Sequence, residues 1–173
     1  LIVLPNSAIV KSHFKTMEEL HMLTVKDLLL RKGRKKIVSI DPDATVYEAL
    51  HTMKENNVGA LLIIENEELR GIFSERDYAR KIALTGKSGR DTFVKDVMVT
   101  KLISVTPENG VEHCMNLMTE QRVRHLPVFE NKKLVGIISI GDVVKGVIDE
   151  QKTTINDLEK YISGGFLSRD SLQ

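Results

Sequence analysis

The chain has only one cysteine, Cys114, among its 173 residues, and it has no tryptophan. A single thiol excludes an internal disulfide and fits a reducing compartment, which we expect to be the cytoplasm or the matrix of an organelle. Aromatic residues make up 5% of the chain, and its formal net charge is only +1. This balance, without a basic strand pair rich in aromatic residues, argues against nucleic acid as a partner.

The sequence also lacks a hydrophobic run long enough to cross a bilayer. Its apolar opening, Leu1 to Val10, is too short for a transmembrane helix and has neither the basic lead nor the small-residue cleavage site of a signal peptide. Hydrophobic residues at 42% and charged residues at 28% are typical of a globular domain. We therefore expect no membrane partner.

Recognisable catalytic patterns are absent as well. The five histidines are scattered without metal-ligand spacing, and the chain contains no P-loop, no GxGxxG motif and no nucleophile elbow. The sequence therefore predicts neither a metal site nor an enzyme.

What the sequence does contain is an internal repeat. The stretch GIFSERD, from Gly71 to Asp77, returns as GIISIGD, from Gly136 to Asp142, at an offset of 65 positions. The same offset aligns the chain with itself, without a gap, from Ser39 to Lys145. A match of this length indicates a duplicated structural unit.

Each copy has the pattern strand, helix, strand, strand, helix. A short strand ends at an Asp-Pro or Thr-Pro step, and an apolar stripe at helical spacing follows it. Two aliphatic strands joined by a polar, Asn-containing turn are typical of an antiparallel hairpin. The short strands are predicted at 37–40 and 102–105, the hairpins at 60–64 with 69–73 and at 126–129 with 134–138, and the closing helices at 75–84 and 141–148.

One such unit buries too little apolar surface to be stable alone. We therefore predict an α/β (α+β) fold in which two β-α-β-β-α repeats pack through their sheets about a pseudo-twofold axis. One helix or two short ones within 15–31 precede the repeats, followed by a basic loop at 31–36 that is expected to be an exposed connector, with a phosphate-facing loop as the alternative. The apolar stripe of a C-terminal helix is suited either to the module or to a second chain. The predicted divisions are an N-terminal extension at 1–24, repeats at 25–86 and 94–149, the C-terminal helix at 150–165 and a tail at 166–173.

The repeated Gly-x-x-Ser-x-x-Asp turn lies where a strand gives way to a helix. Its glycine lets the backbone pass close to a neighbour or a ligand, and its serine, Ser74 or Ser139, is a natural N-cap. Asp77 and Asp142 lie three residues later. A carboxylate there either completes a capping box or accepts hydrogen bonds from the vicinal hydroxyls of a ribose, and spacing alone does not distinguish these uses.

The duplicated unit closely resembles a tandem pair of cystathionine beta-synthase (CBS) domains, often called a Bateman module. The resemblance rests on GIFSERD, on GIISIGD and on RHLPV at Arg124 to Val128, and it covers about Val25 to Ile148. It implies two clefts that bind adenosine-containing ligands such as AMP, ADP, ATP, NAD or S-adenosylmethionine. The Asp and Ser of each motif would hold the ribose. The expected adenine cleft consists of Ile40, Ala60, Leu61, Leu62, Val105, Leu126 and Pro127.

The two copies differ around the expected clefts. The first has Leu62 where the second has Pro127, and it has Arg76 where the second has Gly141. Guanidinium groups match phosphate oxygens, although a surface ion pair is the alternative role for each arginine. The expected phosphate contacts are Arg76, Arg122, Arg124 and His125.

We therefore predict a stand-alone regulatory module with two non-equivalent clefts. AMP is the expected ligand, with ATP or NAD(H) as further candidates, and one cleft is expected to hold a larger ligand than the other. The output goes to a separate, unknown target protein, and the module is expected to be a homodimer. The alternative function is a dimerising protein-interaction scaffold that binds no ligand.

Overall fold

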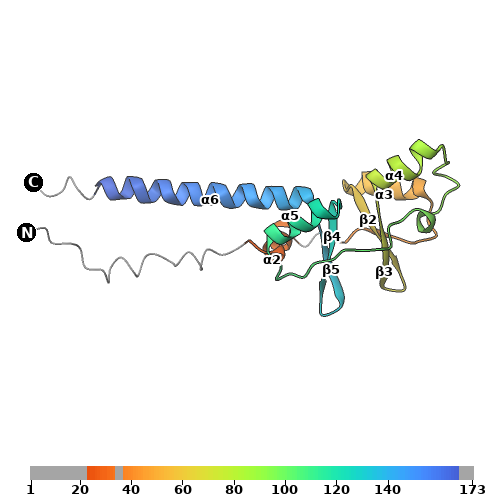
Figure 1. Ribbon diagram of the computed structural model, residues 1–173, viewed down its shortest axis with the longest axis horizontal. Coiled ribbons are helices and arrows are strands. Elements are labelled where there is room, and N and C mark those ends of the chain that lie inside the picture. Colours follow the sequence, from red (N-terminus) through yellow and green to blue (C-terminus); the bar gives the residue numbers. More distant parts are fainter. Residues whose placement is uncertain (1–22, 34–36, 168–173) are drawn as a thin grey trace, which may run out of the picture.

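The computed structural model describes residues 23–33 and 37–167. Two small α/β units lie next to one another, and a long helix, α6 (Ile140–Leu167), runs away from them (Figure 1). The apolar opening, the part of the predicted leading helix before Leu23, residues 34–36 of the predicted loop and the end of the tail lie outside the described residues.

The first unit follows the predicted order of elements. Its sheet joins β1 to β2 in parallel and β2 to β3 in antiparallel orientation. The closing helix ends at Lys81 rather than at Leu84, because the next residues tighten into a 3₁₀ turn that ends at Gly86 with a φ of 71°. The elements are β1 (Ser39–Ile40), α3 (Val46–Asn56), β2 (Ala60–Glu65), β3 (Glu68–Ser74) and α4 (Glu75–Lys81).

The second unit lacks the first strand that was predicted at 102–105. Only an isolated parallel bridge joins Val105 to the next strand, so this sheet has two strands. In the first unit the amide of Leu62 donates to the carbonyl of Val38 at 3.3 Å. The counterpart of Leu62 is Pro127, which has no N–H to donate, and the ladder cannot extend. The elements of this unit are α5 (Val111–Glu120), β4 (His125–Glu130), β5 (Lys133–Ser139) and the first part of α6.

Both hairpins turn through two residues with positive φ. The angles are 49° and 66° at Asn66 and Glu67, and 49° and 63° at Asn131 and Lys132. Positive φ at both central residues defines the type I′ turn, whose twist matches that of the flanking strands and which favours asparagine. The predicted antiparallel hairpins are confirmed.

The two sheets pack against each other through their inner faces. Ala60, Leu62 and Ile72 of the first unit are buried there, with Leu134 and Ile137 of the second packed against them. The predicted fold of two repeats joined through their sheets is confirmed.

The segments that precede the two units are exchanged between them. Helix α2 (Val25–Lys32) precedes the first unit, yet it buries Val25 and Leu28 in the core of the second. The segment before the second unit buries Val94 and Val97 in the core of the first. Neither unit completes its core without a segment that precedes the other.

The repeated glycine of the turn motif allows this exchange. A Cβ atom at Gly71 would lie 2.7 Å from the sulfur of Met98, and one at Gly136 would lie 2.8 Å from a methyl carbon of Leu29. Real Cβ atoms do not approach so closely. At Gly71 the backbone oxygen of Val99 would also lie 3.0 Å away, whereas at Gly136 the side chain of Leu29 would have to shift. Of the two uses considered for this glycine, the structure shows close approach to a neighbouring segment.

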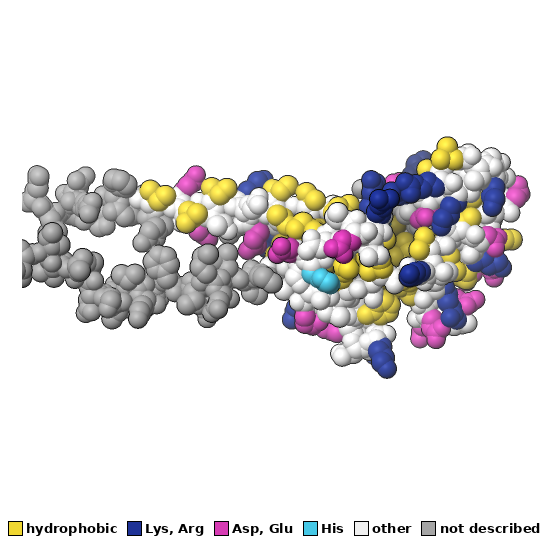
Figure 2. Space-filling view, in the orientation of Figure 1, with side chains coloured by type: hydrophobic (Ala, Val, Ile, Leu, Met, Phe, Trp, Pro, Cys, Tyr) yellow, Lys and Arg dark blue, Asp and Glu magenta, His cyan; other side chains and the backbone are white. Residues whose placement is uncertain are grey.

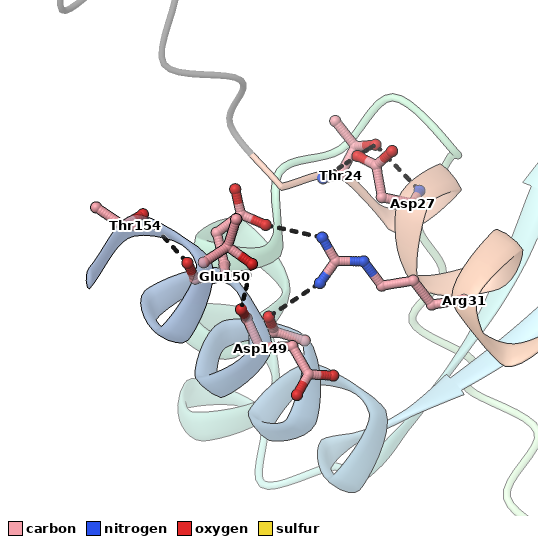
Figure 3. A network of polar contacts seen from close by, with 8 residues as sticks. Thr24, Asp27, Arg31, Asp149, Glu150 and Thr154 are labelled. Carbon is pink, nitrogen blue, oxygen red and sulfur yellow. Dashed lines mark hydrogen bonds and ion pairs between the residues drawn. The ribbon is translucent and has the colours of Figure 1, made fainter. Parts of the chain in front are cut away.

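Polar contacts fasten α2 to α6 (Figure 3). A capping box between Thr24 and Asp27 begins α2. Near its end, the Arg31 guanidinium donates to the carbonyl of Gly146 at 3.3 Å and to the carboxylate of Glu150 at 2.8 Å. Arg31 and Lys32 therefore belong to a packed helix and not to the exposed loop that the basic run predicted.

Helix α6 is continuous, although the sequence predicted two helices at 141–148 and 150–165. No glycine or proline occurs between Val147 and Ser163, and the hydroxyls of Thr153 and Thr154 donate to carbonyls four residues earlier. Nothing local therefore stops the helix. Among the described helices, none is both long and apolar enough to cross a membrane.

We expect Leu28→Ala to lower the free energy of unfolding by about 2–5 kcal/mol, because it opens a cavity in the core of the second unit. Urea denaturation measures this change. Leu30→Ala, two residues along the same helix at a position 70% exposed, should change it by no more than about 0.5 kcal/mol. Equal effects of the two substitutions would contradict the exchanged packing.

Candidate functional site

Two cavities lie between the units, one beside each copy of the turn motif. The larger has a volume of about 840 Å³ and is lined by Ser139 and Asp142. The smaller has a volume of about 300 Å³ and is lined by Arg76, which directly precedes Asp77. The pseudo-twofold axis brings the last residue of α3 and the residues that follow it, at 56–60, to the larger cavity. It brings their counterparts after α5, including 122–124, to the smaller.

Asp142 is held by three hydrogen bonds in the larger cavity. Its Oδ2 accepts from the amide and the hydroxyl of Ser139 and from the Nζ of Lys32, each at 2.8 Å. The amide of Asp142 donates back to the hydroxyl of Ser139 at 3.2 Å, which completes a capping box. Within the described residues, no hydrogen bond ends on Oδ1. The capping use of this carboxylate therefore leaves one oxygen for a second use.

The charges around Asp142 favour its ionised form. Burial alone would raise its pKa, but the hydrogen bonds from Lys32 and Ser139 outweigh burial, and the net pKa is lower than the ordinary value. The pKa of His125, which lines the same cavity, is lowered by burial first and then by repulsion from Lys32, against a smaller attraction to Asp142. At neutral pH the ionised carboxylate of Asp142 and the neutral imidazole of His125 therefore both line the cavity.

Asp77 makes the matching contacts in the first unit. Its Oδ2 accepts from the amide of Ser74 at 3.1 Å and from the hydroxyl at 2.5 Å. Its other oxygen lies 3.2 Å from the Nζ of Lys81, one turn along α4. Both motifs therefore form a capping box and an ion pair, but the lysine comes from the same helix in one case and from the exchanged α2 in the other.

The three arginines expected to bind phosphate all lie at the smaller cavity. Arg76, Arg122 and Arg124 line it together, and the guanidinium of Arg76 donates to the carbonyl of Arg122 at 3.1 Å. Lys and Arg side chains gather over α4 near the second unit (Figure 2). The repeat offset gives their counterparts at the other cleft as Asn57, Gly59 and Gly141.

Because the counterparts of the arginines are small and uncharged, the two clefts differ both in charge and in volume. The fourth residue of the predicted phosphate set, His125, directly follows Arg124 but lines the larger cavity.

Most residues of the expected adenine cleft are core residues. Ala60 lines the larger cavity, and Ile40 packs against the core of the first unit. The others line neither of the two cavities, because these strands are covered on both faces and alternate residues do not reach a cleft. These buried residues are Leu61, Leu62, Val105, Leu126 and Pro127.

Sequence reasoning missed Lys32, which bonds Asp142 and also donates to the carbonyl of Ile137 at 3.2 Å. The sequence did contain a repeat that pointed to the segment carrying Lys32. The triplet Val-Lys-Asp at 25–27 returns at 94–96, at an offset of 69 rather than 65. This second offset extends the duplication to the exchanged segments and assigns α2 to the module.

The low pKa of Asp142 has a consequence for stability. A carboxyl group whose pKa is lower in the folded state stabilises that state above its unfolded pKa, near 3.8, and this contribution is lost as pH falls through the folded value. We expect the difference in unfolding free energy between the wild type and Asp142→Asn to be largest near neutral pH and to shrink in acid. Chemical denaturation from pH 7 to pH 3 measures it. A difference independent of pH would contradict the ion pair with Lys32.

Comparison with known proteins agrees with this architecture. The CBS domain family model matches residues 25–84 and 94–149. The mitochondrial CBS domain-containing protein CBSX3 of Arabidopsis thaliana is 43% identical over 151 residues, which are 83% of this chain and 73% of the relative.

Solved structures match at the level of the whole module. The crystal structure of the CBS domain NE2398 is 48% identical and covers 74% of this chain and 99% of its own, with a TM-score of 0.70. The CBS domain pair of MJ0100, determined in complex with 5′-methylthioadenosine and S-adenosyl-L-methionine, shares 22% identity over 72% of this chain and 94% of its own, with a TM-score of 0.62, and so shows the fold alone. The chain belongs to the CBS domain family and contains two CBS domains as a tandem pair.

Proposed function

We propose that this chain is a regulatory module that binds adenosine-containing ligands in two non-equivalent clefts and signals to a separate protein. The observation that carries the proposal is the larger cavity, where Ser139 and Asp142 of the repeated motif line a space of about 840 Å³. This volume lies within the range of roughly 300–1,000 Å³ that small-molecule pockets occupy. The family assignment supports a regulatory role rather than catalysis.

Asp142 is the residue proposed to hold the ribose. Its Oδ2 is already used by Ser139 and Lys32, so vicinal hydroxyls would donate to Oδ1. An ionised acceptor forms stronger hydrogen bonds than a neutral one. The apolar surface for the base would come from the residues of α2 and of both units that line the same cavity, among them Leu29, Val38, Ala60 and Ile137.

The smaller cavity is proposed to select for phosphate. Three guanidinium groups around about 300 Å³ favour a compact anionic ligand, and AMP is the smallest of the expected phosphorylated ligands. The larger cavity, which Lys26 and Lys32 both line, is the candidate for NAD(H), ATP or S-adenosylmethionine. The MJ0100 pair, which was solved with two adenosine-containing ligands, supports the class of ligand.

Regulation would follow from differential affinity. Both cavities are lined by residues of both units, so a ligand that prefers one packing of the units shifts the module toward that packing. The target protein and the cytoplasmic or organellar location are proposals, and the mitochondrial label of CBSX3 favours an organelle.

We expect Asp142→Ala to weaken the binding of an adenosine ligand about ten- to a hundredfold, because hydrogen bonds to a charged group contribute about 1.5–3 kcal/mol. A thermal-shift panel of AMP, ADP, ATP, NAD, NADH and S-adenosylmethionine, followed by calorimetry with the best ligand, measures the loss. Asp142→Asn preserves the shape of the side chain if the alanine variant folds poorly. Asp149→Ala, on the same helix but outside the cavity lining, is the matched control.

If none of these ligands stabilises the folded wild type, the adenosine proposal fails and the ligand-free scaffold becomes the better function. If Asp142→Ala and Asp149→Ala bind equally well, the larger cavity is not the ribose site.

We expect Arg124→Ala to weaken AMP binding at the smaller cavity about tenfold or more while leaving adenosine binding unchanged, because only AMP carries a phosphate. Calorimetric titration of each variant with both ligands gives the ratio of the AMP affinity to the adenosine affinity. Arg80→Ala, which removes an exposed arginine of α4 that does not line this cavity, should leave the ratio as it is in the wild type. Parallel losses for AMP and adenosine would contradict a phosphate role.

A further inference from the structure

The far part of α6 carries apolar side chains that nothing in the described chain covers. Ile155, Leu158 and Ile162 are 55%, 57% and 61% exposed, and apolar side chains follow the helix away from the module (Figure 2). The sequence left open whether this stripe docks on the module or on a second chain. The structure shows that it leaves the module, since α6 contacts α2, α5 and β5 only near its beginning (Figure 1).

These side chains follow a seven-residue repeat. Ile148, Ile155 and Ile162 occupy one row, and Val144, Gln151 and Leu158 occupy the other, with alternating steps of three and four residues between the rows. This is a heptad pattern with Ile at the a position and Val or Leu at most d positions. Ile at a combined with Leu at d favours parallel, two-stranded coiled coils.

We propose that α6 pairs with the α6 of a second copy of this chain in a parallel, in-register coiled coil. The seam begins on the module at Val144 and continues past Ile162, so it spans about 27 Å at 1.5 Å per residue. A helix segment of this length is marginal in water without tertiary packing. An apolar seam that repeats every 3.5 residues packs against another helix with a seam of the same spacing. A second copy of α6 provides such a helix.

The polar position in the seam supports the parallel arrangement. In register, Gln151 of one copy lies opposite Gln151 of the other, where the two amides can hydrogen-bond. The antiparallel arrangement centred between Ile155 and Leu158 would instead place Gln151 against Ile162 and leave its amide unpaired.

The flanking residues do not oppose this arrangement. Thr154 of one copy lies next to Glu159 of the other, and the residue expected opposite Lys152 is Val147, an apolar residue that packs against the core of its own second unit, so no like charges meet. This inference concerns a surface remote from the two cavities and does not depend on the proposed ligands.

Cysteine cross-linking of the full chain tests the proposal. Leu158→Cys places a thiol in the seam, and Thr153→Cys places one on the opposite face of the same helix. The only native cysteine, Cys114, is fully buried and common to both variants. Under mild oxidation we expect Leu158→Cys to form a disulfide-linked dimer at least tenfold faster than Thr153→Cys, as resolved on non-reducing gels.

A further substitution and a mixing experiment distinguish the parallel pairing from antiparallel pairing and from other partners of the same helix face. Adding Ile155→Asn should reduce the cross-linking of Leu158→Cys at least tenfold, while the circular-dichroism spectrum of the module is retained. Equal rates for the two single-cysteine variants, or a monomeric mass by sedimentation, would overturn the proposal and point to residues 1–22 or another protein on this face. Preferential linkage between Ile155→Cys and Leu158→Cys in a mixture would also overturn it, because it indicates antiparallel pairing.

Discussion

The reciprocal exchange of the segments before each unit is the constraint on which the rest of the structure depends. Val25 and Leu28 complete the core of the second unit, whereas Val94 and Val97 complete that of the first. Each unit alone would expose the apolar face that the exchanged segment covers. The two units thus depend on each other for a complete core, and the clefts form between them.

The exchange also determines how the two aspartates are paired. Asp77 meets a lysine of its own helix, whereas Asp142 meets Lys32, which α2 brings across from before the first unit. The sequence offered capping and ligand binding as alternative uses of each carboxylate. Here the capping bonds and the lysine converge on one oxygen of Asp142, so the carboxylate can begin a helix and still face a cavity.

The difference between the clefts comes from a few substitutions on a symmetric backbone. Arginines occupy three positions at one cleft, and their counterparts at the other are asparagine or glycine. Because a pseudo-twofold axis relates the clefts, residues on different units converge on the same cavity. Duplication followed by substitution has therefore produced one compact basic cleft and one larger cleft whose charged side chains are of both signs.

The sequence by itself determined the features that depend on local chemistry and on the repeat. The offset of 65, the Asn-containing turns and the Ser-x-x-Asp caps specify the duplicated unit, its hairpins and its helix starts, because turn geometry and capping involve residues close in the chain. Only the tertiary structure decided which distant residues meet. It placed Lys32 on Asp142, gathered three arginines at one cleft and directed His125 to the lining of the other. It also showed that no strand pairs with Pro127 at 102–105. The missing N–H of this proline matters only when another segment lies beside it and offers a carbonyl group. Burial on both faces of the strands kept most of the expected adenine residues in the core. The path of α6 away from the module left its apolar stripe exposed. These outcomes depend on contacts across the chain, which local patterns restrict but do not specify.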